Sequence, residues 1–260
     1  MYDLRALESA FTGTIFAGKL HFAHSTESTN SDAMTAARNG APHGSVWFAD
    51  EQTAGRGRGD HRWHSAAGEG LYVSVLLRPE WTAARLPLLP LSAGFAAAEA
   101  IRAVTGLAID LRWPNDLLIG PRKVGGILIE ATLSPKNPPH AVVGVGINVH
   151  QRDFDPGLAT PATSLDLASG TRIARQALLI ALLQLLQRET TALARLDAPV
   201  TIPKRVEQLS TWTRGRSVIV HGPQACAGMT AGLDESGFLR VATADGIVTV
   251  QTGGIRATEE

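Results

Sequence analysis

The sequence contains a single cysteine, Cys226, so an intramolecular disulfide is impossible and no oxidising compartment is implied. It also lacks a signal peptide, because residues 1–5 begin neither a basic stretch nor an apolar stretch. The longest apolar run, at 177–186, is broken by Gln184 and is too short to span a bilayer. These absences predict a cytoplasmic protein with no membrane-embedded part.

The chain has no excess of charge of either sign. Its 24 Lys and Arg residues balance 24 Asp and Glu residues, so the formal net charge is zero. A protein that mainly holds long nucleic acid normally shows a basic excess. Hydrophobic residues make up 44% of the chain and charged residues 18%, which is an ordinary globular balance. The sequence predicts one or two folded domains, in which phosphate binding depends on local clusters.

Familiar nucleotide-binding and zinc-binding signatures are missing. Residues 13–19 match most of a P-loop, but Leu20 stands where Ser or Thr is required, and the order of helix and strand is reversed. No Gly-x-Gly-x-x-Gly pattern opens a helix after a strand, so a dinucleotide fold is unsupported. His61 and His64 lack partners at zinc spacing, and we expect them to be polar loop residues.

Strands and helices are predicted in an irregular order. Helical spacing marks residues 3–11, 30–39, 88–104 and 173–196. Asn30 is available as the N-cap of the second helix. Apolar strands are predicted at 19–23, 46–49, 71–77, 117–119, 126–133 and 141–149. Because strands and helices do not alternate strictly, the pattern favours an α+β fold, with a mixed sheet flanked by helices.

The pattern changes after about residue 212. Short β-rich runs separated by polar turns follow at 217–220, 225–233, 238–243 and 247–252. Asp245-Gly246 lies between two of these runs and signals a hairpin. We therefore predict a large domain over residues 1–212 and a small β-barrel or sandwich over residues 213–260.

The most unusual segment follows Gln52, where the glycines of residues 55–59 alternate with Arg56 and Arg58. This stretch cannot be a stable strand or helix, because each glycine adds backbone freedom. Its amides and guanidinium groups can converge on an anion. The alternative is a flexible linker or a nucleic-acid-binding tail. Such tails lie at termini or in long polar tracts, whereas this stretch lies between two apolar strands, which favours an anion-binding loop.

Two shorter stretches place polar groups beside predicted strands. In Arg112-Trp113-Pro114-Asn115-Asp116, the proline presents the following Asn and Asp in a defined turn, although a plain Asx-capped turn explains this motif alone. Lys123 enters an apolar strand through two glycines, where backbone can approach a ligand closely. A lone lysine at a strand edge is usually solvated. A third stretch, Gly144 to Asn148, ends a buried strand on an asparagine.

Taken together, these stretches resemble the biotin protein ligase family. The family's motifs appear in order as Ser28-Thr29-Asn30, Gln52 to Trp63-His64-Ser65, Arg112 to Asp116, Lys123 to Glu130, and Gly144 to Asn148. Residues 231–239 are similar to part of the family's SH3-like tail. Any one motif is weak, but five in order at compatible spacing are specific, and the resemblance covers nearly the whole chain. It implies a catalytic domain of the class II synthetase type followed by an SH3-like β-barrel.

The resemblance implies an ATP-dependent enzyme that forms biotinyl-5′-AMP from biotin and MgATP. It then transfers biotin to a specific lysine of a biotin carboxyl carrier protein domain. The catalytic residues it implies are Lys123, Arg58 and Asp116, of which Asp116 organises the loop or holds Mg²⁺. The biotin-binding residues it implies are Ser28, Thr29, Asn30, Gln52, Gly55, Arg56, Arg58, Lys123 and Gly125. The ATP- and adenylate-binding residues it implies are Arg56, Arg58, Trp63, Asn115, Lys123 and Asn148.

The chain departs from the family pattern at two positions. Arg112 stands where lysine is common, which keeps the charge but alters the geometry, and His61 stands where arginine is frequent. Because the sequence starts directly at the catalytic motifs, we expect no N-terminal DNA-binding domain and no specific DNA binding. A homodimer and the identity of the acceptor carboxylase are left open.

Two other functions fit parts of the sequence. A lipoate or octanoate ligase or transferase would share the catalytic fold, but the Gly-Arg-Gly-Arg loop and the SH3-like tail argue against it. A non-enzymatic nucleic-acid-binding module could use the same loop. The zero net charge, and the lack of aromatic residues between the arginines, disfavour that function.

Overall fold

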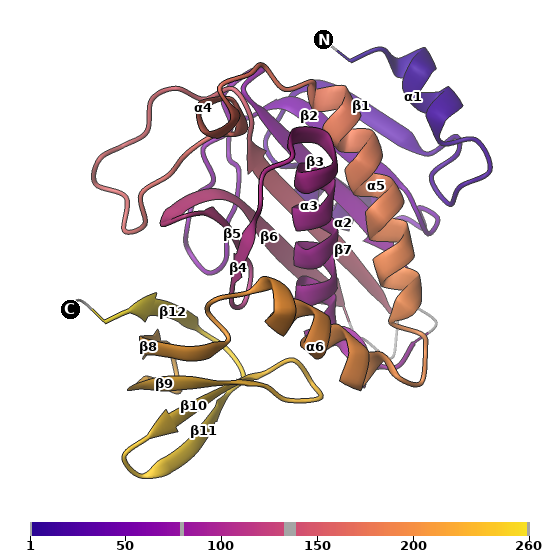
Figure 1. Ribbon diagram of the computed structural model, residues 1–260. Helices are drawn as coiled ribbons and strands as arrows, with labels where there is room; N and C mark the ends of the chain where they lie inside the picture. The colour runs from indigo at the N-terminus through magenta and orange to yellow at the C-terminus, as the bar shows by residue number, and fades with distance from the viewer. Residues whose placement is uncertain (1, 79–80, 133–138, 259–260) are drawn as a thin grey trace.

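The computed structural model describes residues 2–78, 81–132 and 139–258. Its strands form two sheets, one of seven strands and one of five, with helices packed around them (Figure 1). The order in the large sheet is β1-β2-β3-β7-β6-β5-β4. These strands span Leu20–Thr26 (β1), Val46–Gln52 (β2), Gly70–Leu77 (β3), Asp110–Arg112 (β4), Asp116–Ile119 (β5), Arg122–Thr132 (β6) and His140–Asn148 (β7). β1 and β2 are parallel while the other neighbours are antiparallel, so the mixed sheet is confirmed. The predicted end of one strand at residue 133 lies outside the described residues.

Helices cover both faces of the large sheet, which explains its apolar central strands. α3 (Leu89–Thr105) and α5 (Arg175–Ala192) pack together over one face. On the other face, α2 (Thr29–Arg38) places Ala33 and Ala37 against Leu76 and Val142. A strand with both faces covered is apolar at most positions, and all of β3, including Ser74, is buried. α1 (Leu4–Ala10) packs on α5 near the N-terminus.

α2 begins earlier than the sequence pattern predicts. Ser28 occupies the N-cap position with extended backbone, and Asn30 lies inside the first turn. The prediction that Asn30 caps this helix is therefore wrong. The reason is tertiary, because the Asn30 side chain hydrogen-bonds to Ser74 and Glu130 of the sheet instead of to its own helix.

α3 is a core helix with the composition of a membrane span. Together with the 3-10 turn η1 (Ala83–Leu88), it is long and apolar enough to cross a bilayer by length and composition alone. Arg85, Glu99 and Arg102 interrupt its apolar run, so the sequence pattern does not single it out. In the structure 61% of its most apolar window is buried inside the protein. Its small side chains, such as Ala93 and Ala97, are buried between the sheet and α5.

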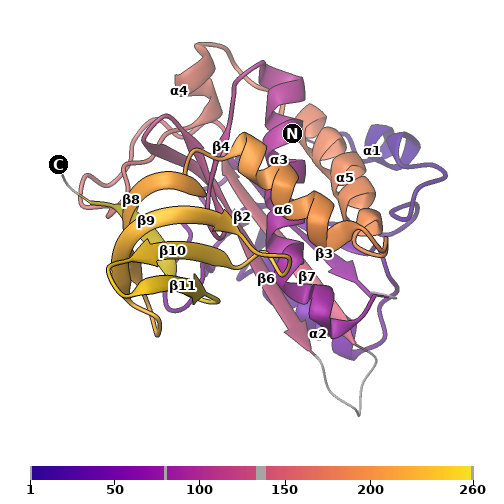
Figure 2. The ribbon, with the colours of Figure 1, turned by 60° about the horizontal axis from the view of Figure 1, so that its bottom comes forward.

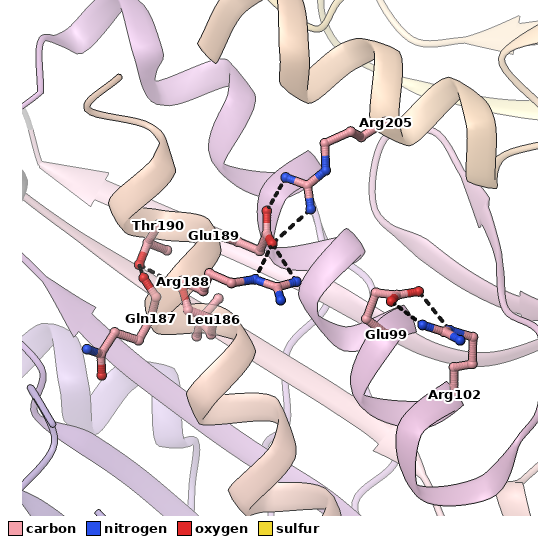
Figure 3. A network of polar contacts seen from close by, with 8 residues as sticks. All are labelled: Glu99, Arg102, Leu186, Gln187, Arg188, Glu189, Thr190 and Arg205. Atoms are coloured by element: carbon pink, nitrogen blue, oxygen red, sulfur yellow. Dashed lines mark hydrogen bonds and ion pairs between the residues drawn. The ribbon is translucent and has the colours of Figure 1, made fainter. Parts of the chain in front are cut away.

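A buried carboxylate ties α5 to the segment that leads into the small sheet. Glu189 of α5 is only 2% exposed, and Arg205 of α6 (Ala198–Leu209) binds both its oxygens at 2.7 and 2.9 Å (Figure 3). Arg188 donates to one of the same oxygens at 3.1 Å. The Arg205 guanidinium also lies 4.1 Å from the centre of the Phe95 ring of α3. A buried charge needs partners of this kind, so Glu189 fixes α6 against α5 and α3.

The small sheet follows α6 directly. Its order is β11-β10-β9-β8-β12, and all described pairings are antiparallel. The strands span Arg214–His221 (β8), Cys226–Leu233 (β9), Leu239–Thr243 (β10), Gly246–Val250 (β11) and Gly254–Ala257 (β12). Figure 2 shows them curving beside α6. Four of the five strands match predicted runs, and the α+β prediction with a small C-terminal β unit is confirmed.

Five elements are absent from the sequence-based prediction: β4, β12, α6, the 3-10 turn η1 and the short helix α4 (Leu165–Ser169). Pro203 hides α6, because proline in the interior of a helical pattern normally signals its end, whereas Pro199 lies in the first turn, where proline is tolerated. β4 has three residues, and β12 has four, too few to show a clear period. The division of the chain at residue 212 stays a prediction; the small sheet begins at Arg214.

Candidate active site

The start of α2 meets the end of β2. The backbone N–H of Thr29 donates to Gln52 Oε1 at 2.9 Å, and the Thr29 hydroxyl donates to the same oxygen at 3.1 Å. Gln52 Nε2 in turn donates to Ser65 Oγ at 2.9 Å. Ser28 and Thr29 are buried. Thr29 of the Ser-Thr-Asn motif, Gln52 and Ser65 at the end of the arginine loop are therefore brought together.

A second polar chain runs from this point across the sheet. The Ser74 hydroxyl lies 2.8 Å from Thr29 Oγ1 and 2.6 Å from Asn30 Oδ1. Asn30 Nδ2 donates to Glu130 Oε2 at 2.9 Å, and Arg56 forms an ion pair with that oxygen. Ser74 and Glu130 were given no role by sequence reasoning. The available signals were a polar residue in each of two apolar strands and, for Glu130, its place at the end of the Lys123 to Glu130 motif.

Glycines let these side chains approach the backbone. A Cβ at Gly144 would lie 2.1 Å from Asn30 Oδ1, and a Cβ at Gly55 would lie 2.4 Å from the carbonyl oxygen of Trp63. Real Cβ atoms do not come this close, so either substitution would displace a site residue. Gly125 is similarly enclosed, because a Cβ there would lie 2.9 Å from the Gly146 carbonyl oxygen. The glycines of the motifs are thus explained by packing around the site.

Three charged residues from the β4, β5 and β6 strands form one compact cluster. Asp116 Oδ1 lies 2.5 Å from Lys123 Nζ, and Asp116 Oδ2 lies 2.6 Å from Arg112 Nη2. The side chains of Asp116, Arg112 and Lys123 are 15%, 11% and 27% exposed. Burial raises the pKa of the Asp116 carboxyl, but Lys123 and Arg112 outweigh burial and hold it below its ordinary value. The Asp116 carboxylate therefore stays ionised at neutral pH, between the two basic side chains.

Trp63 lies beside this cluster, and its ring packs against the backbone of Gly146 and Gly126. A Cβ at Gly146 would lie 2.6 Å from Trp63 Nε1, and a Cβ at Gly126 would lie 3.6 Å from the ring. Lys123 Nζ is 5.5 Å from the ring centre, within the range of a cation–π contact. The buried Nε1–H has no partner among the described residues. A buried donor normally finds an acceptor, so this group is suited to face a bound ligand.

The arginine loop folds back on itself and reaches the small sheet. Trp63 N–H donates to the Gly55 carbonyl at 2.9 Å, and Gly57 N–H donates to the His61 carbonyl at 2.7 Å. Arg58 Nη1 donates to the carbonyl oxygen of Gly253 at 2.8 Å. Burial lowers the pKa of the Arg58 guanidinium, while the Asp116 charge acts in the opposite direction. Arg58 thus joins the loop, the charged cluster and the small sheet.

The two predicted adenylate-binding asparagines hold backbone. Asn115 Nδ2 donates to the Ile127 carbonyl at 2.8 Å, and Asn148 Nδ2 donates to the Thr163 carbonyl at 3.1 Å. Both contacts fix the turns that flank the charged cluster. Their roles toward a nucleotide remain predictions.

A cavity of about 140 Å³ lies where the two sheets meet. Its lining includes Arg58, Trp113, Asn115, Phe238 and Gln251. Trp113 Nε1 crosses the same junction and donates to the Gly237 carbonyl at 3.1 Å. Sequence reasoning missed the contribution of the small sheet, because no motif in residues 237–253 pointed to the arginine loop.

Comparisons with known proteins agree with this geometry. Residues 22–148, which contain all five motifs, match the model of the Biotin/lipoate A/B protein ligase family. The chain is 35% identical over 231 residues to the bifunctional ligase/repressor BirA of Bacillus spizizenii, covering 88% of this chain and 70% of that one. It is 32% identical to the biotin–[acetyl-CoA-carboxylase] ligase of Paracoccus denitrificans, covering 82% of this chain and 90% of the relative.

A solved structure shows the same arrangement. The biotin protein ligase of Aquifex aeolicus, in complex with biotin and ATP, superimposes with a TM-score of 0.78 at 28% identity. The match covers 93% of this chain and 100% of that one, so both sheets are included. The chain belongs to the biotin protein ligase family.

Proposed function

We infer that this chain is a biotin–protein ligase that adenylates biotin with ATP and biotinylates a carboxyl carrier protein. The observation that carries the inference is the Lys123–Asp116–Arg112 cluster, which lies beside Trp63 and Arg58. Family membership supplies the substrates, and the cluster supplies the charge that they require. A cytoplasmic location is part of the same proposal.

The first step joins two anions. A carboxylate oxygen of biotin attacks the α-phosphorus of ATP, a P–O bond forms, and pyrophosphate leaves with the broken P–O bond electrons. Negative charge concentrates around the α-phosphate, so fixed cations lower the barrier. We assign this role to Lys123, whose ammonium is held by Asp116, and to Arg58 of the loop, while Arg56 binds the carboxylate of biotin.

In the second step the acceptor lysine amine attacks the carbonyl carbon of biotinyl-AMP. The new C–N bond replaces the C–O bond to phosphate, AMP leaves with its electrons, and the amine loses a proton. Water would hydrolyse the same anhydride, so the site must stay closed between the steps. The Arg58–Gly253 contact supports a closed loop, because it ties the loop to the small sheet.

A protein-built magnesium site at Asp116 does not fit the described residues. Both Asp116 oxygens are paired with cations, and no group of three His, Cys, Asp or Glu side chains that could hold a metal occurs in the described part of the chain. Mg²⁺ prefers six oxygen ligands, mostly water and phosphate. We therefore treat Mg²⁺ as part of the MgATP substrate and assign Asp116 to the positioning of Lys123.

We propose that the polar side chains of Thr29, Gln52 and Ser65, which hydrogen-bond to one another, bind the ureido ring of biotin, which offers both N–H donors and a carbonyl acceptor. The dithiolane ring of lipoate offers neither group. This difference favours biotin over the lipoate alternative. The ligase reaction alone is proposed, since the matched residues carry the ligase motifs.

The test is incubation of the chain with biotin, MgATP and a biotin carboxyl carrier domain, followed by intact mass measurement. The expected result is a mass gain of one biotinyl group on the carrier. A gain with lipoate and none with biotin would contradict the proposal.

Lys123→Ala tests whether the Lys123 ammonium takes part in adenylation, with Lys204→Ala as the matched control. Because Asp116 keeps Arg112 as a partner, we expect the fold to be retained while adenylate formation falls at least about a hundredfold. Lys204→Ala, at an exposed position of α6, should behave as the unmodified chain. Pyrophosphate release measures both variants, and ordinary release by Lys123→Ala would remove Lys123 from the reaction.

A further inference from the structure

Glu130 is the charged end of the Lys123 to Glu130 motif, and the reaction above gives it no part. It lies near the end of β6, opposite Val142 of β7, with 27% of its side chain exposed. One of its oxygens, Oε2, receives both Asn30 Nδ2 and the Arg56 guanidinium. We call the contact of these three residues the Glu130 bridge.

The Glu130 bridge is the fixed support of Arg56. Within the described residues, Glu130 is the hydrogen-bonding and ion-pairing partner that the structure gives to the Arg56 side chain. Arg56 itself comes from the glycine-rich loop and is 43% exposed, so its own backbone offers little restraint. Glu130 comes from a long paired strand and is held by Asn30, which Ser74 holds in turn.

The bridge also reaches the other end of the site. Gln52, Thr29, Ser74, Asn30, Glu130 and Arg56 form an unbroken series of polar contacts. At one end are Gln52 and Thr29, which we assign to the ureido ring of biotin. At the other end is the Arg56 guanidinium, which we assign to the anionic end of the substrate. A series of this kind fixes the distance between the two ends, because the intermediate residues lie on packed strands and a helix.

Electrostatics requires that Glu130 and Arg56 act together. A bare carboxylate at this position would repel the carboxylate of biotin and the phosphates of ATP. Arg56 cancels that repulsion while leaving other N–H donors of its guanidinium to an incoming anion. Holding the long side chain in place before binding also reduces the entropy lost when the ligand arrives.

We propose that Glu130 is a positioning residue that holds Arg56 over the site and aligns it, through Asn30, with the ureido end of the pocket. The proposal rests on the proposed function, since it concerns how the same site binds its anionic substrate. It assigns no proton transfer and no covalent step to Glu130.

The test is a double-mutant cycle with steady-state adenylation kinetics, read by pyrophosphate release. Glu130→Ala should raise KM for biotin about tenfold, with kcat changed less than about threefold. Glu130→Gln keeps an oxygen that can accept from both Asn30 and Arg56, so it should restore KM to within about threefold. Glu99→Ala removes an unrelated surface carboxylate–arginine pair on α3 (Figure 3) and should leave both constants unchanged.

The decisive comparison is made in the Arg56→Ala background. There the Glu130 carboxylate has lost its cation, so adding Glu130→Gln should lower KM for biotin instead of raising it. A merely structural Glu130 would give losses that add in the double variant, and that result would overturn the proposal. A KM for biotin that is higher in the Arg56→Ala/Glu130→Gln double variant than in Arg56→Ala would also overturn the proposal.

The cycle separates this proposal from the proposed function. If the unmodified chain does not biotinylate a carrier, the proposed function fails first. If it does, and Glu130→Ala has the KM of the unmodified chain, only the role of Glu130 is wrong. If Glu130→Ala does not fold, the test uses Glu130→Gln alone. The direction in which Glu130→Gln changes KM for biotin, with Arg56 present and with Arg56→Ala, then decides whether Glu130 positions Arg56.

Discussion

Replacing Asp116 with asparagine removes the one negative charge that two cations share. Asn has nearly the shape of Asp, so packing is preserved while the attraction is lost. Lys123 and Arg112, at 2.5 and 2.6 Å from the carboxylate oxygens, would then face a neutral amide and each other. The variant therefore isolates the electrostatic part of the cluster.

The magnitude follows from burial. Removing one partner of a buried ion pair costs about 3–5 kcal/mol, because the remaining charge is left without compensation. The three side chains are between 11% and 27% exposed, so water partly solvates the charges that lose their partner. The lower end of the range, about 3 kcal/mol, therefore applies. For a chain of this size, each kcal/mol lowers Tm by roughly 2–4 °C. We expect a fall of about 6–12 °C.

Two measurements follow the change. Calorimetry or thermal-shift fluorescence gives Tm, and pyrophosphate release gives the adenylation rate, which should fall at least about tenfold as Lys123 loses its fixed position. Asp197→Asn removes an exposed carboxylate that pairs with Arg195, and it should leave both readings unchanged. A Tm fall below about 2 °C, with ordinary adenylation, would refute the argument that the cluster is a buried, functional ion network.

The pH dependence has a definite sign. The pKa of Asp116 lies below its ordinary value of 3.8 in the folded chain, so its charge stabilises the fold above that value. That stability is lost as pH falls through the folded pKa. The Tm difference between the unmodified chain and Asp116→Asn should therefore be constant from about pH 5 to pH 8 and shrink only below about pH 4.

Two further substitutions test the neighbouring contacts. Gly146→Ala would place a Cβ 2.6 Å from Trp63 Nε1, and we expect the displaced ring to weaken ATP binding about tenfold by calorimetry, whereas Gly254→Ala, whose Cβ meets nothing within 4 Å, should not. Unchanged ATP affinity in Gly146→Ala would remove Trp63 from the nucleotide site. Arg58→Gly loses the hydrogen bond to Gly253, so biotinyl-AMP should escape and label lysines of an added bystander protein. Labelling confined to the carrier would show that this contact does not retain the intermediate.

Much of the fold could be predicted because the central strands must be apolar on both faces. β3 and β7 are therefore visible as continuous runs, and the polar turns between β9, β10 and β11 are equally clear. α6 could not be found in this way, because Pro203 inside it carries the signal of a helix end. Its position depends on Glu189 and Arg205, which lie 16 residues apart and meet only after α5 and α6 fold back on each other.

The sequence by itself determined which residue types surround the site. The glycines that alternate with Arg56 and Arg58, the lysine before Gly125 and the Trp-Pro-Asn-Asp turn are local patterns, and their order along the chain indicated the family. Patterns of this kind depend only on residues that are close in sequence, so they can be recognised without knowledge of the tertiary structure.

Only the tertiary structure decided which of these residues act on one another. Arg56 meets Glu130 across 74 residues, and Arg58 meets the Gly253 carbonyl across 195. Asn30, expected to cap its helix, turns to Glu130 instead. Contacts between segments so far apart depend on strand order and register, which the spacing of residues in one sequence does not encode. The physical reason is that a charged side chain takes the partner that folding brings within reach, and not the nearest one along the chain.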